Sequence, residues 1–200
     1  NVFLDIGQVP GEPDMDVCER AALVPVVENE YLGRACYFIG VIHTIQSSNV
    51  LDPAGELDNA MDAFAVVAGI EGQDIRITEQ ALLAMARIAK EQGDYGTAVA
   101  YYQQIPDDSE ILDLKLYELI YTFIDQGLWS EALAEVDIFL TAYPDHRWAA
   151  QMHLLKGHLH MKEEQLQLAN TAYEDLRDRS EPVRELLDEV SENEEELAQI

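Results

Sequence analysis

The sequence predicts an all-α protein built as an α-solenoid, a row of stacked helix-turn-helix repeats. A period of 34 residues between Ala81 and Pro144 carries this prediction, because Gln92-Gly93 recurs as Gln126-Gly127. Apolar residues at helical spacing precede each glycine: Leu82, Met85, Ala86 and Ala89 in one copy, and Leu116, Leu119, Ile120 and Phe123 in the next. A period of this length, made of two short amphipathic helices, is typical of helical repeat proteins.

The residues around each turn resemble the tetratricopeptide repeat (TPR) family. An aromatic residue, Tyr95 or Trp129, follows each glycine; an alanine stands in each second helix; and Pro144 closes the unit. The resemblance implies a right-handed superhelix with a concave groove. Residues 139–145, followed by Leu154-Leu155-Lys156-Gly157, are similar to a bacterial subtype of the family found in cell-envelope proteins. This similarity favours a periplasmic location over a cytoplasmic one.

The register of the repeat extends in both directions from this central stretch. Residues 1–13 contain two prolines and two glycines and are expected to form an extended arm. Residues 14–180 are expected to hold the solenoid: a helix at 14–24, then about four repeats at 26–70, 75–106, 109–144 and 147–180. The first repeat is divergent, and in the fourth the segment Met161-Lys162-Glu163-Glu164 replaces the Gly-aromatic turn.

The last segment, 181–200, is predicted to be a separate acidic amphipathic helix that begins near Pro182 and caps the solenoid. Its apolar stripe contains Val183, Leu186, Leu187, Val190 and Leu197. A terminal helix of this kind covers the apolar face of the final repeat. The start of a longer tail or of a coiled coil is the alternative.

Composition excludes several classes of partner. The chain has 12 Lys and Arg against 39 Asp and Glu, a net charge of -27, which disfavours nucleic acid and anionic membrane surfaces. No apolar run is long enough for a membrane helix, so direct membrane insertion of this chain is not expected. Cys18 and Cys36 match no metal-binding spacing. Two buried thiols are favoured over a bridge between them, because cysteine is often buried without pairing.

A candidate binding site follows from the face that the first helix of each repeat turns to the concave side. None of its sixteen positions is acidic, in a chain with about one acid in five residues. The stripe comprises Arg34, Tyr37, Val41 and Thr44; Gln80, Leu83, Arg87 and Lys90; Leu114, Tyr117, Tyr121 and Ile124; and Gln151, Leu154, His158 and Met161.

A groove of tyrosines, aliphatic residues and a few bases suits a protein or peptide partner with apolar anchors and some acidic groups. The sequence therefore predicts a protein–protein interaction scaffold within a bacterial envelope assembly. Two alternatives stay open: the groove is filled by the chain's own segment 2–6, or these positions simply pack. A structural, self-associating subunit is the second function considered, and the oligomeric state is left open.

An enzymatic role is not predicted. His153, His158 and His160 share one predicted helix, but they do not lie on one face, so they are not expected to converge on a metal. No phosphate-binding loop, nucleophile motif or calcium loop is present, and no cofactor is expected. The Lys and Asn pattern with which some members of the family grip a terminal carboxylate is missing, since Leu83 and Arg87 stand at its positions.

Overall fold

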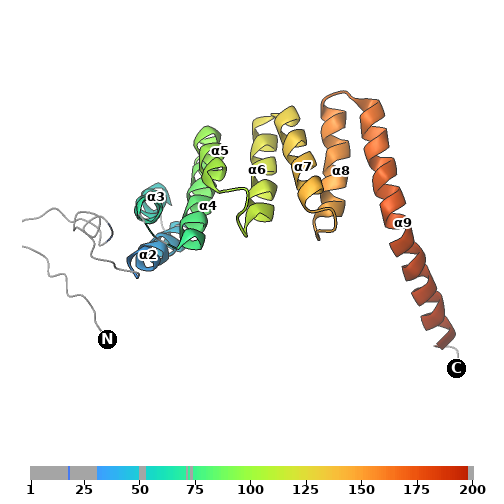
Figure 1. The fold of residues 1–200 in the computed structure, drawn as a ribbon, viewed down its shortest axis with the longest axis horizontal. Coiled ribbons are helices and arrows are strands. Elements are labelled where there is room, and N and C mark those ends of the chain that lie inside the picture. The colour runs from blue at the N-terminus through green and yellow to red at the C-terminus, as the bar shows by residue number, and fades with distance from the viewer. Residues whose placement is uncertain (1–17, 19–30, 50–52, 71, 73, 198–200) are drawn as a thin grey trace, which may run out of the picture. The chain divides into compact units, whose positions relative to one another are not determined.

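A computed structural model describes residues 18, 31–49, 53–70, 72 and 74–197, with side chains up to residue 190. Within these residues the chain forms eight α-helices and no strand (Figure 1), which confirms the predicted all-α class. The helices belong to two compact units, Asn1–Glu110 and Ile111–Ile200. Over the described residues, no helix is both long and apolar enough to cross a bilayer.

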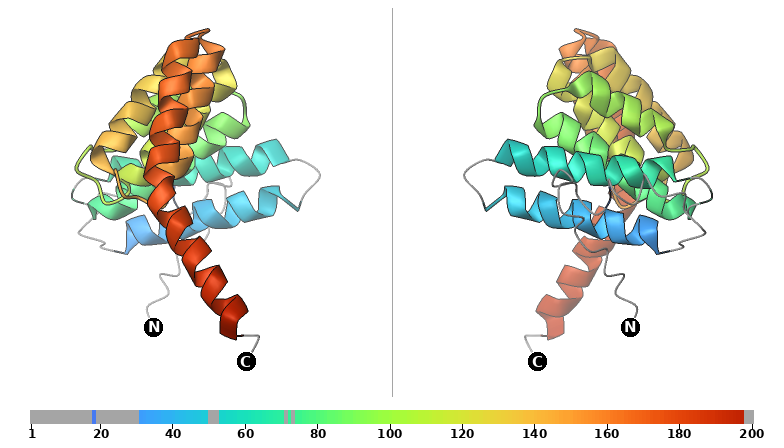
Figure 2. Two further views of the ribbon diagram at one scale, coloured as in Figure 1. Left: turned by 90° about the vertical axis from the view of Figure 1, so that its right-hand side faces the viewer. Right: turned by 90° about the vertical axis from the view of Figure 1, so that its left-hand side faces the viewer.

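The first unit contains α2 (Leu32–Ser47), α3 (Pro53–Gly69), α4 (Ile75–Glu91) and α5 (Tyr95–Gln104). Each helix contacts the next along the chain, and α2 and α3 lie side by side (Figure 2). Aspartates begin two of these helices: Asp74 accepts a hydrogen bond from the Arg76 backbone N–H, and Asp94 accepts one from the Thr97 N–H, both at 3.1 Å. These hydrogen bonds hold the pKa of both carboxyls below the usual range.

The second unit contains α6 (Leu112–Gln126), α7 (Trp129–Ala142), α8 (Ala149–Lys162) and α9 (Leu166–Leu197), again with each helix against the next. Its second helix buries Ala132, Val136 and Phe139, each fully covered. These positions follow Ala98, Tyr102 and Ile105 by 34 residues, and those side chains are also buried. The predicted register therefore places the same face in the core of both units.

Three of the helices end in the same left-handed turn. Gly93, Gly127 and Glu164 have φ angles of 81°, 74° and 58°. In each case the next backbone N–H bonds to a carbonyl five residues back, at 2.8 Å for Asp94 to Ala89, 2.9 Å for Leu128 to Phe123 and 2.8 Å for Gln165 to His160. This is the Schellman arrangement that closes a helix C-terminus. Met161–Glu164 therefore forms the turn of the other repeats, with a glutamate where they have glycine.

Helix pairs approach closely where a small residue faces a large one. A Cβ atom added at Gly40 of α2 would lie 2.7 Å from Cε1 of Phe64 on α3. On α8 and α9, a Cβ at Gly157 would overlap the ring of Tyr173. Where the corresponding first helix carries the large residue Ile120, its partner in the buried cluster is the smaller Val136. The sizes of the two residues are therefore matched within each pair.

The arm predicted at 1–13 and the helix predicted at 14–24 lie outside the described residues, apart from Cys18. Cys18 is helical and buried, and it forms a disulfide with Cys36 of α2, with the two Cα atoms 5.7 Å apart. The preference for two separate thiols was therefore wrong, although both sulfurs are buried as expected. Pairing depends on the tertiary distance between the two residues, which the spacing of two cysteines does not specify.

The predicted boundary near Pro182 was also wrong. The second helix of the fourth repeat and the acidic helix form one continuous element, α9, with Pro182 inside it. Proline removes one N–H donor from a helix but has a helical φ angle, so it weakens the helix without having to end it. Figures 1 and 2 show that α9 begins beside α8 and then extends beyond it. The apolar stripe from Val183 to Val190 is exposed, so it does not cap the second unit.

Candidate functional site

The second unit brings half of the predicted stripe together on its surface. Residues from α6 are half-buried and residues from α8 are exposed: Leu114, Tyr117, Tyr121 and Ile124 on the first helix, and Gln151, Leu154, His158 and Met161 on the second. Around the first turns of α8 they meet Trp148, which the sequence reasoning did not include. We call Tyr117, Tyr121, Trp148, Gln151 and Leu154 the aromatic surface.

Gln151 joins the two helices within this surface. Tyr117 and Tyr121 are four residues apart on α6, so their side chains share one face, and their ring centroids lie 5.0 Å apart. The Gln151 side-chain amide donates to the Tyr121 hydroxyl at 2.9 Å and to the Tyr117 hydroxyl at 3.3 Å. Burial raises the pKa of Tyr121, which stays a neutral hydroxyl at physiological pH. Gln151 follows Tyr117 by 34 residues, so equivalent stripe positions of successive repeats are neighbours here.

Trp148, at the N-terminal end of α8, packs on the other side of Tyr117, with ring centroids 4.5 Å apart. His146 holds it in place, because its Nδ1 accepts the Trp148 backbone N–H at 3.3 Å. An Nδ1 that accepts leaves the proton on Nε2, which lies 3.3 Å from a carboxylate oxygen of Asp113 on α6. The Arg147 guanidinium lies 4.7 Å from the Trp148 ring centroid. The tryptophan is thus tied to α6 and flanked by a cation.

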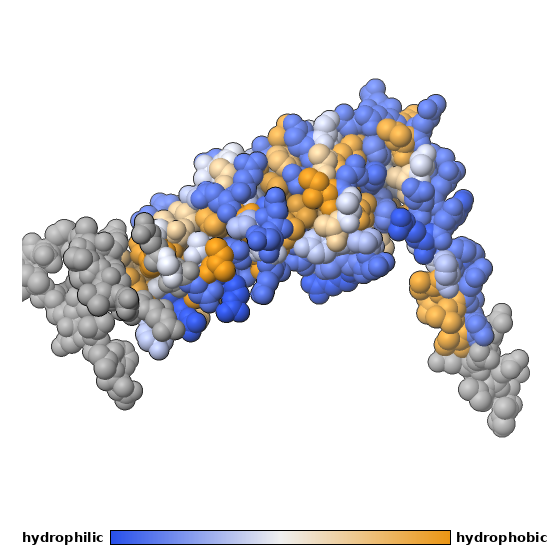
Figure 3. Space-filling view, viewed as in Figure 1, coloured by the Kyte–Doolittle hydropathy of each residue, from blue (hydrophilic) through white to orange (hydrophobic). Residues whose placement is uncertain are grey.

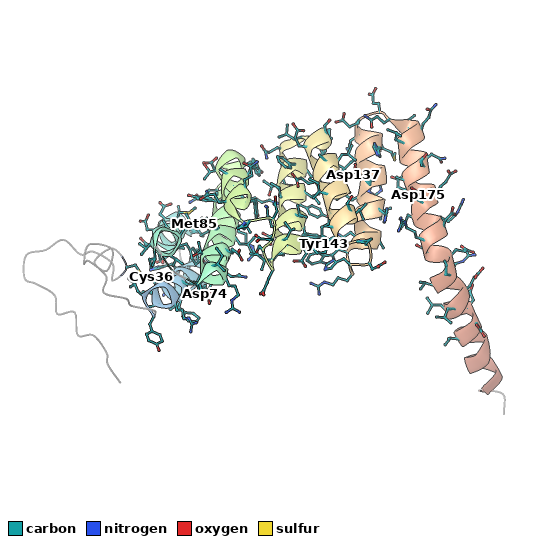
Figure 4. All side chains as sticks on the ribbon, in the orientation of Figure 1. Cys36, Asp74, Met85, Asp137, Tyr143 and Asp175 are labelled. Atoms are coloured by element: carbon teal, nitrogen blue, oxygen red, sulfur yellow. A yellow bond between two sulfur atoms is a disulfide. The ribbon has the colours of Figure 1, made fainter. Side chains whose placement is uncertain are left out.

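An aromatic layer supports this surface from within. Phe139 is fully buried, and its ring lies 5.5 Å from His146, 5.5 Å from Tyr143 and 6.4 Å from Trp148. Tyr143 ends α7 (Figure 4), and burial, followed by the charge of Asp113, raises its pKa. Side chains locked by such contacts lose little conformational entropy when they bind a partner.

The loop residues Tyr143, His146, Arg147 and Trp148 escaped the sequence reasoning, which assigned this stretch only to the end of a repeat. Three ring-bearing residues within six positions between two helices were the available signal. A fixed 34-residue register cannot find them, because it compares helix positions and this loop has no counterpart with the same residues.

At the far end of α8, the predicted stripe meets α9. The His158 ring stands edge-on to Tyr173, with centroids 5.9 Å apart, and the Tyr173 hydroxyl lies 3.3 Å from the Met161 sulfur. Met161 nevertheless keeps 51% of its surface exposed and Leu154 keeps 42%. This end of α8 therefore offers further apolar surface next to the aromatic surface.

In the first unit the predicted stripe residues differ more in exposure. Arg34 and Arg87 are exposed, whereas Tyr37 and Val41 are half-buried against the core, with the Tyr37 ring 5.5 Å from Phe64. Thr44, Gln80 and Lys90 are half-buried. Leu83 is a correction, because it is only 1% exposed and offers no surface to a partner. The helical period assigned it to the groove, but an α4 helix surrounded by neighbours buries more than one face.

The histidines have separate partners instead of a common one. His43 lies 2.7 Å from a Glu56 carboxylate oxygen, and His160 lies 2.8 Å from the Gln165 amide oxygen. Burial, with the positive charges of Arg179 and Lys156 next, lowers the pKa of His153. In the described part of the chain no three His, Cys, Asp or Glu residues gather closely enough to hold a metal ion.

Comparison of the sequence with models of known protein families finds no match, and comparison with functionally characterised proteins finds no similar sequence. The resemblance to the TPR family therefore depends on the repeat residues alone. Any functional argument has to come from the surfaces described above.

Proposed function

We propose that this protein is a TPR-like α-solenoid scaffold that binds a peptide or helix of a partner protein at the aromatic surface. The observation that carries the proposal is the set of contacts around Gln151, which holds Tyr117 and Tyr121 together with Trp148 on the outside of the second unit. Tyrosine, tryptophan and arginine are the residue types that contribute most to binding energy in protein interfaces. A surface of this kind, prearranged by its own contacts, needs little further ordering on binding.

The chemistry of the surface indicates the kind of ligand. Leu154 and Met161 extend the apolar area along α8, and none of the stripe positions on α6 and α8 is acidic. Arg147 adds a cation beside the Trp148 ring. The ligand is therefore a segment with apolar or aromatic anchors and some acidic groups, in contrast to the strongly acidic chain that binds it.

A selection from a displayed library of random peptides tests this proposal. Binders selected on the wild-type protein are assayed against Leu154→Asp, which places a charge in the aromatic surface. The matched control is Ile138→Asp on α7 of the same unit, where the side chain is 50% exposed and outside the surface. We expect Leu154→Asp alone to lose binding, by about tenfold or more. Binders that tolerate both changes, or a selection that returns none, would refute the proposal.

A structural, self-associating role is the second candidate, and one observation favours it. Phe38, Ile42 and Ile45 form an apolar row on α2, with 63%, 51% and 61% of their surfaces exposed. Sedimentation of the wild type and of Ile42→Lys across a concentration series tests this role. A monomer for both proteins at all concentrations would exclude it, whereas a dimer lost in the variant would support it.

The disulfide supports a location in an oxidising compartment such as the periplasm. Bridges between cysteines persist in the envelope and are rare in the reducing cytosol. Alkylation of the protein before and after reduction, followed by intact-mass measurement on material from its natural cells, tests this assignment. Free Cys18 and Cys36 thiols in that material would contradict it.

A further inference from the structure

We infer that the C-terminal part of α9 is a docking site for an amphipathic helix of a partner protein whose apolar stripe is flanked by Lys and Arg. The α9 stripe consists of Val183, Leu186, Leu187 and Val190, which are 60%, 60%, 62% and 48% exposed. Figure 3 shows these hydrophobic residues gathered on the part of α9 that lies beyond α8. The inference goes beyond the proposed function, because it concerns another surface and a ligand of opposite charge.

The stripe has the geometry of one side of a helix pair. Its residues are separated by three, one and three positions, and Val183 and Val190 are seven apart, so all four face one side of α9. Leu176, seven residues before Val183, is still half-buried, and Ala169 and Ala172 are buried at 3% and 5% exposure. The face that α9 packs in its first turns thus continues as an exposed stripe where its packing ends.

The charges beside the stripe specify the occupant. Between residues 181 and 197 the helix carries eight acids and a single base, Arg184, which pairs with Glu181 on the same helix. A second copy of α9 would place acids against acids, and like charges across a helix pair are destabilising. A helix with Lys and Arg at its flanks would meet these acids with opposite charge, which favours and orients the complex.

The α9 helix has a physical need for such a partner. Pro182 removes one backbone hydrogen bond in its middle, and Glu181, Glu185 and Glu189 form like-charged pairs four residues apart. Helices without tertiary contacts are marginal in water. A docked helix would bury the α9 stripe and neutralise the acids, so binding is expected to raise the helicity and thermal stability of this segment.

Three synthetic peptides of about 21 residues, three heptads, test the inference on the full chain. The first has a leucine stripe flanked by lysines; the second has glutamates in place of the lysines; and the third contains the residues of the first in an order without a stripe. We expect fluorescence anisotropy to show binding of the first peptide alone, with an affinity that falls as salt rises to about 0.3 M. Equal binding of the scrambled peptide would reveal mere charge attraction and overturn the inference.

Variants of the chain locate the site. Leu186→Ser with Leu187→Ser should weaken the basic amphipathic peptide by about tenfold or more, whereas Leu166→Ser, 68% exposed on the same helix but outside the α9 stripe, should not. Because these side chains are exposed, all variants should keep the wild-type unfolding temperature. Leu154→Asp should also bind normally, which separates this site from the aromatic surface. Unchanged binding by the Leu186/Leu187 variant, or a wild-type dimer that this variant abolishes, would refute the inference.

Discussion

Gly40→Ala tests whether the close approach of α2 and α3 depends on a missing side chain. The added Cβ would lie 2.7 Å, 2.8 Å and 2.9 Å from three carbons of the Phe64 ring. Distances of this size are well inside van der Waals contact, so something must move. The ring has little room, because Phe64 is 1% exposed and packs against Tyr37 and the buried core of the first unit.

The expected magnitude is the difference of two effects. Overpacking a well-filled core costs about 1–3 kcal/mol. Replacing glycine by alanine inside a helix stabilises it by about 1 kcal/mol, because alanine loses less backbone entropy. Since the ring that must move is buried, we expect a net loss of about 1–2 kcal/mol in the free energy of unfolding. In a chain of this size, each kcal/mol lowers the unfolding temperature by about 2–4 °C.

Thermal and urea unfolding, followed by circular dichroism without reductant, measures this loss. The matched control is Gly69→Ala at the end of α3, where an added Cβ meets no atom within 4 Å. The control should be unchanged or slightly stabilised. If Gly40→Ala proved as stable as its control, the argument that this glycine is required by the helix contact would be refuted.

A double-mutant cycle with Phe64→Leu separates the steric effect from other causes. Phe64→Leu alone should destabilise the first unit, because it leaves part of the ring's volume empty. In the Gly40→Ala background the same change makes room for the new methyl group, so it should cost less. Additive losses would mean that the two residues do not compete for space.

Two further predictions concern the second unit. Glu164→Gly should stabilise it by about 0.5–1 kcal/mol and Gly127→Ala destabilise it by about 1 kcal/mol in urea unfolding, because both positions have a left-handed φ angle; Glu164→Ala, which removes the charge but keeps a Cβ, should give no gain, and a gain equal to that of glycine would contradict the reasoning. The folded pKa of His153 lies below its ordinary value of 6.5, mainly because of burial and then the charge of Arg179, so the native state binds fewer protons and stability falls as pH drops below about 6.5. His153→Gln should flatten the decline between pH 6.5 and 5, and an unchanged slope would show that this histidine does not cause it.

The repeat was readable because it is a property of neighbouring residues. Ala98 and Ala132, 34 residues apart, are both fully buried, and α5 has the bounds that the sequence predicted, Tyr95–Gln104. Helical period and turn glycines act over a few residues, so they are visible in the sequence. The same local reasoning failed at Pro182, where a weakened helix continues, and at Leu83, where burial depends on several neighbouring helices.

The candidate site was only partly readable. The helical register selected Tyr117, Tyr121 and Gln151 as neighbours, and the structure joins them by hydrogen bonds. It did not select Trp148 or His146, because these residues lie at a helix end and in a loop where no period applies. Their positions are determined by contacts with Asp113 and Phe139, which are distant in the chain.

The sequence by itself determined the all-α class, the 34-residue register and the faces that each second helix buries, because local periodicity specifies them. Only the tertiary structure decided which distant residues meet and which face remains uncovered. It paired Cys18 with Cys36, placed Trp148 on Tyr117, and left the stripe from Val183 to Val190 exposed on a helix expected to be a cap. An apolar stripe looks the same in a sequence whether it meets a neighbour or solvent, because burial is a property of the packed molecule.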